Sequence, residues 1–268
     1  MQHLNNLYLI VFLTIVIHFV GIVSLSARIV GTQTGRIASS TSIFNFVGLL
    51  AQFSSAIQAP LLTKSIEKNI ILGNPPDDYV FRMIIFSATI GAVLGAITIP
   101  TMHRFMKKGV DALYIHNSIF MVIVKSFKFS TLHHLKQSIK SPTSLNFIRL
   151  KKYKDMPLGI LFLNVVVYSF ITVSVLSCLY AGYLNPNLRT TALSMNGFSI
   201  GLGVIGLSLF VEPYTATLTD KVIAGEIQQP YFRKYLTYVI VARIFGTLLG
   251  QFLFIPLAGV IIRLAEWL

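Results

Sequence analysis

Charged side chains are scarce in this chain, and acidic ones are the scarcest. Only 12% of the 268 residues are charged, with 9 Asp and Glu against 22 Lys and Arg, whereas 54% are hydrophobic and the mean hydropathy is +0.72. Soluble domains carry about 25% charged residues, so this composition excludes a soluble globular protein, including a soluble nucleic-acid binder. The sequence therefore predicts an integral membrane protein.

Cysteine is almost absent, and catalytic motifs are missing. The single Cys178 allows neither a disulfide within the chain nor a cysteine-ligated metal centre. His133 and His134 stand in a basic segment without a carboxylate cluster, and no serine has a credible base beside it. We therefore expect no catalytic residues, no metal and no cofactor.

Long apolar runs occupy most of the sequence. A helix needs about 20 mainly apolar residues to cross the roughly 30 Å hydrocarbon core of a membrane. The first run has no basic flank and exceeds the apolar core of a signal peptide, so we expect it to be retained. Six runs predict an all-α integral membrane protein with six transmembrane helices, at residues 4–26, 37–62, 79–102, 156–182, 191–212 and 235–262.

Positive charge is concentrated in one connection. Residues 104–155 contain 11 of the 22 Lys and Arg, which places this segment in the cytoplasm and, by alternation of the spans, both termini outside. Within it, residues 110–124 are apolar, too short to span the membrane and flanked by basic residues. We expect an amphipathic helix at the membrane interface, in contact with anionic lipid. A loop whose basic residues serve only topology is the alternative.

Polar landmarks recur in the two halves of the chain. Three spans per half would make the second half enter the membrane from the opposite side, an arrangement common in transporters. The sequence thus predicts two inverted three-helix repeats, residues 1–102 and 156–268, separated by a basic cytoplasmic loop at 103–155. An offset of 153 positions aligns Arg36 with Arg189, Thr41 with Ser194, Pro60 with Pro213, Glu67 with Asp220 and Lys68 with Lys221.

Three spans carry polar side chains at helical spacing. Such stripes are not expected to face lipid, because a polar side chain needs a partner there. They predict either hydrogen bonds between helices or a wet central cavity, and three stripes together favour the cavity. The stripes are Thr41, Asn45, Gln52 and Ser55 in the second span, Asn164, Tyr168 and Thr172 in the fourth, and Arg243, Thr247 and Gln251 in the sixth.

Arg243 is the most costly of these residues, since an arginine away from the ends of a span costs about 2.5 to 3.5 kcal/mol on insertion scales. It needs an anion, for which Glu212 and a substrate phosphate are the two candidates. Glu67, Glu212 and Asp220 themselves either bind a proton or cation or pair with neighbouring basic residues.

Two further features indicate ligand binding and motion. The tract from Arg28 to Arg36 contains two glycines and two threonines and precedes a helix, which suits an anion site. Pro60 and Pro213 lie at matching depths and predict helix ends or hinges.

Four short segments, SAR at 26–28, TGRIA at 34–38, SIFN at 42–45 and IQAPL at 57–61, resemble the Amj ("alternate to MurJ") family of lipid II flippases. This resemblance implies a protein of the bacterial cytoplasmic membrane that acts in peptidoglycan synthesis. The implied cargo is undecaprenyl-pyrophosphate-linked disaccharide pentapeptide, carried from the inner to the outer leaflet. Membrane lipids and the cell-wall synthesis machinery are the implied partners.

Under this hypothesis, charge and position assign a role to each candidate residue. Arg28 and Arg36 admit the head group, Arg243 contributes to holding the pyrophosphate, and Arg189 marks the exit. The halves move about the prolines, the sugars pass Asn45, Gln52, Tyr168 and Gln251, and Gln58 is a further substrate-binding residue. Two other functions remain open, namely an integral membrane enzyme acting on a polyprenyl phosphate and an assembly subunit without transport.

Overall fold

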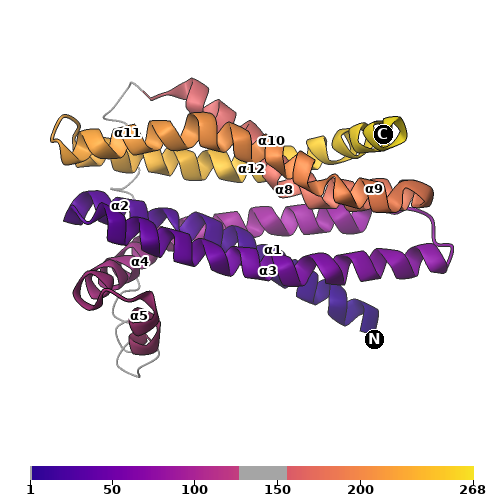
Figure 1. The fold of residues 1–268 in the computed structure, drawn as a ribbon, viewed down its shortest axis with the longest axis horizontal. Coiled ribbons are helices and arrows are strands. Elements are labelled where there is room, and N and C mark those ends of the chain that lie inside the picture. Colours follow the sequence, from indigo (N-terminus) through magenta and orange to yellow (C-terminus); the bar gives the residue numbers. More distant parts are fainter. Residues whose placement is uncertain (1, 127–155) are drawn as a thin grey trace.

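The structure is a computed structural model that describes residues 2–126 and 156–268, and the elements of these two ranges are helical (Figure 1). The predicted all-α class is confirmed. The helices are α1 (Gln2–Val23), α2 (Leu25–Thr34), α3 (Ile37–Ile71), α4 (Tyr79–His116), α5 (Ile119–Ser126), α8 (Leu158–Leu184), α9 (Arg189–Ser194), α10 (Asn196–Gly206), α11 (Glu212–Ile223) and α12 (Gln229–Trp267), with a 3-10 turn at Pro186–Leu188 and a π-helical turn at Leu207–Val211.

Six helical segments of the described chain are long and apolar enough to cross a membrane, as predicted. Several continue well past the predicted spans, because polar residues end an apolar run without ending a helix. α4, for example, continues to His116 and stops before Asn117, whose φ of 50° breaks the helical path. The segments are Leu7–Thr34, Ile37–Ile71, Tyr79–His116, Leu158–Leu184, Pro186–Ile223 and Gln229–Trp267.

The central segment differs from its predicted outline. α4 continues through residue 102 to His116, so residues 110–124 are divided between the end of α4 and the short α5 instead of forming one separate helix. Residues 127–155, with most of the predicted basic loop, lie outside the described residues. A position of this segment at the membrane interface stays a prediction.

The tract from Arg28 to Arg36, which lies between the first two predicted spans, is mostly helical. Most of it belongs to α2, a buried helix that continues α1 after Ser24 and packs against α3 and α4. The turn itself is short: α2 ends at Gly35, whose φ of 69° is a left-handed conformation that glycine adopts without strain.

Each half is built on one close pair of parallel helices. A Cβ atom on Gly95 of α4 would lie 3.0 Å from the Phe19 carbonyl oxygen of α1, and a Cβ on Gly246 of α12 would lie 2.8 Å from the Val165 carbonyl oxygen of α8. Gly91 likewise meets the backbone of Ile15. The glycines therefore allow α4 to reach the backbone of α1, and α12 that of α8.

The two halves run in opposite directions. In Figure 1, α1 and α4 run from right to left, whereas α8 and α12 run from left to right. We call the left end, with the α2–α3 turn and the α11–α12 loop, the α2 end, and the right end, with α9 and the α3–α4 loop, the α9 end. This arrangement is the one that an inverted repeat requires, while the duplication itself stays a prediction.

Apolar side chains from both halves meet at each end. The cluster at the α2 end includes Ile22, Leu25, Ile29, Leu161, Leu218, Phe232, Tyr235, Leu236 and Ile240. The cluster at the α9 end includes Ile10, Leu62, Ile66, Phe81, Tyr180, Tyr183, Ala192, Phe254 and Leu257. Both ends are therefore packed shut between the halves.

Gly246→Ala tests the close pair of α8 and α12. The added methyl group would overlap the α8 backbone, and overpacking of this kind costs about 1 to 3 kcal/mol. We expect a lower melting temperature of the detergent-solubilised protein, measured by intrinsic fluorescence. Gly259→Ala, on the same helix but with nothing within 4 Å of the new methyl group, is the matched control and should not lower it. Equal stability of both variants would contradict the close packing.

Candidate functional site

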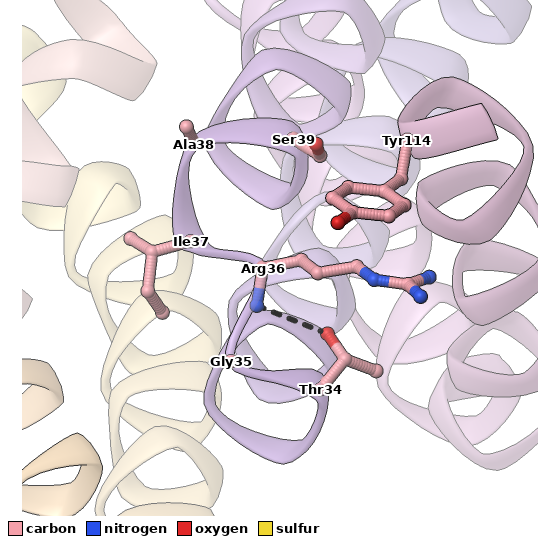
Figure 2. Close-up of a pocket in the computed structure, with 7 residues that line it drawn as sticks. All are labelled: Thr34, Gly35, Arg36, Ile37, Ala38, Ser39 and Tyr114. Atoms are coloured by element: carbon pink, nitrogen blue, oxygen red, sulfur yellow. Dashed lines mark hydrogen bonds between the residues drawn. The ribbon is translucent and has the colours of Figure 1, made fainter. Parts of the chain in front are cut away.

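A hollow of about 380 Å³ lies at the turn from α2 to α3 (Figure 2). The Arg36 backbone N–H donates to Thr34 Oγ1 at 3.4 Å, and the Arg36 guanidinium stacks 4.1 Å from the centre of the Tyr114 ring. Arg36 also pairs with Asp111 of α4. The lining residues are Thr34, Gly35, Arg36, Ile37, Ala38, Ser39 and Tyr114.

This hollow has the features of an anion site. α3 starts here with no side chain capping its first turn, so its first backbone N–H groups point out of the helix without intrahelical partners. The partial positive charge of a helix start and the Arg36 guanidinium favour a negative group at the same place. An anion that enters the hollow competes with Asp111 for Arg36.

Arg28 forms an ion pair between the halves at the α2 end. Its Nη2 donates to Glu212 Oε2 of α11 at 2.6 Å, and its guanidinium lies 4.4 Å from the centre of the Phe44 ring. The neighbouring Gln229 Nε2 donates to Thr32 Oγ1 at 2.8 Å and so ties α12 to α2. Glu212 is thus a partner of Arg28, and the alternative that it compensates Arg243 is wrong.

Arg189 forms a second ion pair between the halves, at the α9 end, with Glu67 of α3. Close by, the Tyr183 hydroxyl of α8 donates to the Pro75 carbonyl oxygen at 3.0 Å, in the loop between α3 and α4. The sequence left two roles open for Glu67, namely binding a proton or cation and pairing with a basic residue. The structure shows the pairing.

Arg243 lies on α12 between the two apolar clusters, and it is only 6% exposed. Its Nη1 donates to the Gly21 carbonyl oxygen of α1 at 3.1 Å, and its guanidinium carbon is 4.8 Å from the centre of the Tyr168 ring of α8. Its Nε has no partner, and within the described ranges no carboxylate pairs with it. Arg243 is therefore a buried cation without a counter-ion in this part of the chain.

Asn164 joins Arg243 as a second buried polar group with unmet hydrogen-bonding capacity. It lies one turn before Tyr168 on α8, is fully buried, and neither atom of its amide has a partner in the part of the chain that the structure describes. His18 of α1, 9% exposed, has its ring centre 6.4 Å from that of Tyr168. We call Arg243, Tyr168, Asn164 and His18 the central polar cluster. Asn164 is not among the predicted binding residues, although its spacing from Tyr168 in the stripe could have found it.

The expectation that the three polar stripes meet in one wet cavity is wrong. On α3, Thr41, Asn45 and Gln52 lie on an exposed face, and only 11% of the apolar stretch of this helix is buried. The neighbouring Gln58 turns the other way, and its amide donates to Thr14 Oγ1 and, at 3.3 Å, to the Ile10 carbonyl oxygen. α3 lies on the outside of its half, so one of its faces is left uncovered.

The stripe of α12 serves largely to join it to α4. Gln251 Nε2 donates to the Arg82 carbonyl oxygen at 2.9 Å, and Arg82 Nη1 donates back to the Gln251 carbonyl oxygen at 3.1 Å. One turn earlier, the hydroxyls of Thr89 and Thr247 are 3.0 Å apart. For Gln251, a hydrogen bond between helices is the role that the structure displays.

The two predicted hinge prolines differ in their local structure. Pro60 lies inside α3, which continues to Ile71, so it does not end a helix. Pro213 stands in the first turn of α11, directly after the π-helical turn Leu207–Val211. The helix continues without a break from α10 through the π-helical turn into α11, so the missing N–H of Pro213 falls where the regular hydrogen-bond ladder is already interrupted. A hinge at either position stays a prediction.

Six helices long and apolar enough to span a membrane, two halves of opposite direction and the buried Arg243 between them define the class of this protein: a multi-pass membrane protein with the opposed halves that are common in transporters. The chain belongs to the Amj family, "Alternate to MurJ", whose family model matches residues 13–265. It is 30% identical over 263 residues to a protein of Bacillus subtilis (strain 168) named "Lipid II flippase Amj", and the match covers 94% of each chain. No solved structure matches. The resemblance seen in four short segments is thus confirmed over nearly the whole chain.

Removing a buried cation that has no counter-ion should not weaken the fold. Replacing ionic groups in an apolar interior by apolar ones is often neutral or stabilising, whereas removing one member of a pair leaves the other unpaired. We therefore expect Arg243→Met to keep or raise the melting temperature in detergent, and Arg28→Met, which strands Glu212, to lower it. A larger loss for Arg243→Met than for Arg28→Met would show that Arg243 has an essential structural role.

Proposed function

We propose that this protein is a lipid II flippase, which moves undecaprenyl-pyrophosphate-linked disaccharide pentapeptide from the inner to the outer leaflet of the bacterial cytoplasmic membrane by alternating access. Membership of the Amj family and the relative named a lipid II flippase support this function. The observation in the molecule that carries it is Arg243, a cation held between two closed ends without a counter-ion among the described residues. Such a group suits an anionic cargo that arrives and leaves.

The α2 end is the proposed entrance. Positive-inside orientation puts this end in the cytoplasm and both termini outside. The hollow beside Arg36 and the start of α3 receives the pyrophosphate, whose oxygens accept charge-assisted hydrogen bonds from the guanidinium groups of Arg36 and Arg28. The bulky head group is thereby brought to the interface between the halves.

The central polar cluster is the proposed midpoint of the route. Arg243 offers the unpartnered Nε–H to a phosphate oxygen, and the Asn164 amide offers both a donor and an acceptor. Tyr168 stacks on the guanidinium and holds it in position. When the halves separate, the phosphate can replace the Gly21 carbonyl oxygen as the partner of Arg243.

The exposed face of α3 is the proposed track for the sugars and the peptide. A polar head group inside a membrane needs hydrogen-bonding partners, and Thr41, Asn45 and Gln52 supply them along three turns. The isoprenoid tail stays in the lipid beside α3. This geometry lets the head group cross without a channel wide enough to enclose the whole cargo.

Transport fits the family better than an enzymatic reaction on the same lipid, since the relative is named a flippase. Membrane lipids are a second proposed partner, through the basic segment and α5. Arg189, at the far end of the route, is the proposed exit residue. The cell-wall synthesis machinery is a third proposed partner.

Arg243→Ala and Arg36→Ala test the proposed phosphate ligands. A hydrogen bond to a charged group contributes about 1.5 to 3 kcal/mol, so each variant should lower transport roughly 10- to 100-fold. The measurement is the accessibility of lipid II at the outer leaflet in cells whose other flippase has been shut off. Arg263→Ala, at an exposed position near the end of α12, is the control and should transport normally. Full transport by both test variants would contradict the assigned roles.

The double variant Asn45→Ala with Gln52→Ala tests the track on α3. Because both side chains are exposed, we expect an unchanged melting temperature but at least a severalfold loss of lipid II transport in the same assay. Phe53→Ala, which removes an exposed apolar side chain from the same helix, is the matched control and should leave transport near normal. Equal transport by the double variant, the Phe53→Ala variant and the unmodified protein would exclude the track.

A further inference from the structure

Two of the ion pairs in the described chain connect the halves, one at each end. Arg28 of α2 and Glu212 of α11 meet at the α2 end, with 2.6 Å between Nη2 and Oε2. Arg189 of α9 and Glu67 of α3 meet at the α9 end. In Figure 1, α2 and α11 lie together at the left, and α9 and the final turns of α3 lie at the right.

The charges are distributed in a crossed pattern. The first half supplies the arginine at the α2 end and the glutamate at the α9 end, and the second half supplies the opposite members. The other two pairs of the described chain, Arg36 with Asp111 and Arg82 with Asp78, stay within the first half. Among these four pairs, only the crossed pair at a given end must therefore break when the halves separate at that end.

In both crossed pairs the glutamate is the more accessible partner. The side chains are 19% exposed for Arg28 against 35% for Glu212, and 27% for Arg189 against 44% for Glu67. A carboxylate at such a position can move into water at modest cost, while the arginine stays between the halves. Each arginine can thus exchange its internal anion for another one.

A pyrophosphate is a suitable replacement for these carboxylates. The planar guanidinium group presents the same pair of donors to carboxylate and to phosphate oxygens, and a doubly charged group competes well against a single carboxylate. Exchange of one anion for another keeps the arginine compensated throughout. It also frees the glutamate, which removes the ionic contact that holds that end shut.

We propose that the two crossed pairs are anion-exchange gates. The pyrophosphate of the cargo displaces Glu212 from Arg28 and so opens the α2 end, while Arg189 and Glu67 keep the α9 end closed. The reverse exchange takes place at Arg189 when the cargo leaves. The gates deepen the proposed flippase function and rest on it, because they assign the same arginines to closing the route and to binding the cargo.

Thiol labelling can report which end is open. Cys178→Ala gives a cysteine-free chain, because Cys178 is the single cysteine of the sequence. Into this background we would place Leu218→Cys or Leu62→Cys, two buried positions on the second span of each half, which are 4% exposed in the α2-end cluster and 3% exposed in the α9-end cluster. Labelling rates with a polar maleimide are then measured in lipid nanodiscs, where both faces are accessible.

Neutralising one glutamate should open its own end only. We expect Glu212→Gln to raise the labelling rate at position 218 about fivefold or more and to leave position 62 slow, and Glu67→Gln to do the reverse. Asp111→Asn breaks a pair within one half and is the matched control, with no change at either position. Equal labelling in all these variants, or opening of both ends at once, would overturn the gates.

Inorganic pyrophosphate tests the exchange itself. Added to the protein with Leu218→Cys, it should accelerate labelling at position 218, and Arg28→Gln should make the rate independent of pyrophosphate. The charge-swapped protein, Arg28→Glu with Glu212→Arg, keeps an ion pair and should fold with the end closed, but its transport should fall because the cation has left α2. Normal transport by the swapped protein, or no response to pyrophosphate, would contradict anion exchange.

These measurements separate the gates from the flippase function. The labelling rates at positions 218 and 62 are measured without lipid II. They can therefore change with the glutamate variants as expected even in a protein that does not deliver lipid II to the outer leaflet. In that case the gates stand and the proposed function fails. Lipid II transport by a protein whose labelling is the same in all glutamate variants would instead support the function and overturn the gates.

Discussion

Compensation of positive charge inside an apolar molecule is the constraint on which the closed form of this protein depends. Arg28 and Arg189 each find a glutamate on the opposite half, so the same contacts that neutralise them also hold the two ends together. Arg243, between those ends, has only the Gly21 carbonyl oxygen and the face of Tyr168 among the described residues. The distribution of carboxylates therefore distinguishes two closed ends from a centre that suits an incoming anion.

The packing of the helices fits this division. α4 on α1 and α12 on α8 approach through glycines to backbone distance, which makes each pair a stiff unit. The second span of each half is far less buried, at 11% for α3 and 22% for the span that contains α9, α10 and α11. These outer helices carry Glu67, Arg189 and Glu212. The ionic contacts between the halves therefore lie largely on the helices that are least fixed by buried contacts.

The chemistry of the proposed cargo is consistent with the parts of the molecule taken separately. A pyrophosphate suits the arginines at the α2 end and between the halves, a sugar and peptide head suits the amides and hydroxyls exposed on α3, and an isoprenoid tail suits the surrounding lipid. Membership of the Amj family ties these parts to one function. The sequence pattern identifies most of the participating residues but predicts that they share one cavity, because a stripe of polar residues on a helix does not say what lies opposite to it.

The sequence by itself determined the membrane class, the six spans and the family, since hydrophobic length, loop charge and short sequence motifs are local properties of the chain. It also found Arg28, Arg36, Arg189 and Arg243, because a charge in an apolar setting is visible without a fold. Only the tertiary structure decided that Glu212 pairs with Arg28 and not with Arg243, that Asn164 is buried without a partner among the described residues, and that Asn45 and Gln52 face outwards. Partners 122 and 184 positions apart in the chain are chosen by how helices pack, and no local pattern encodes that choice.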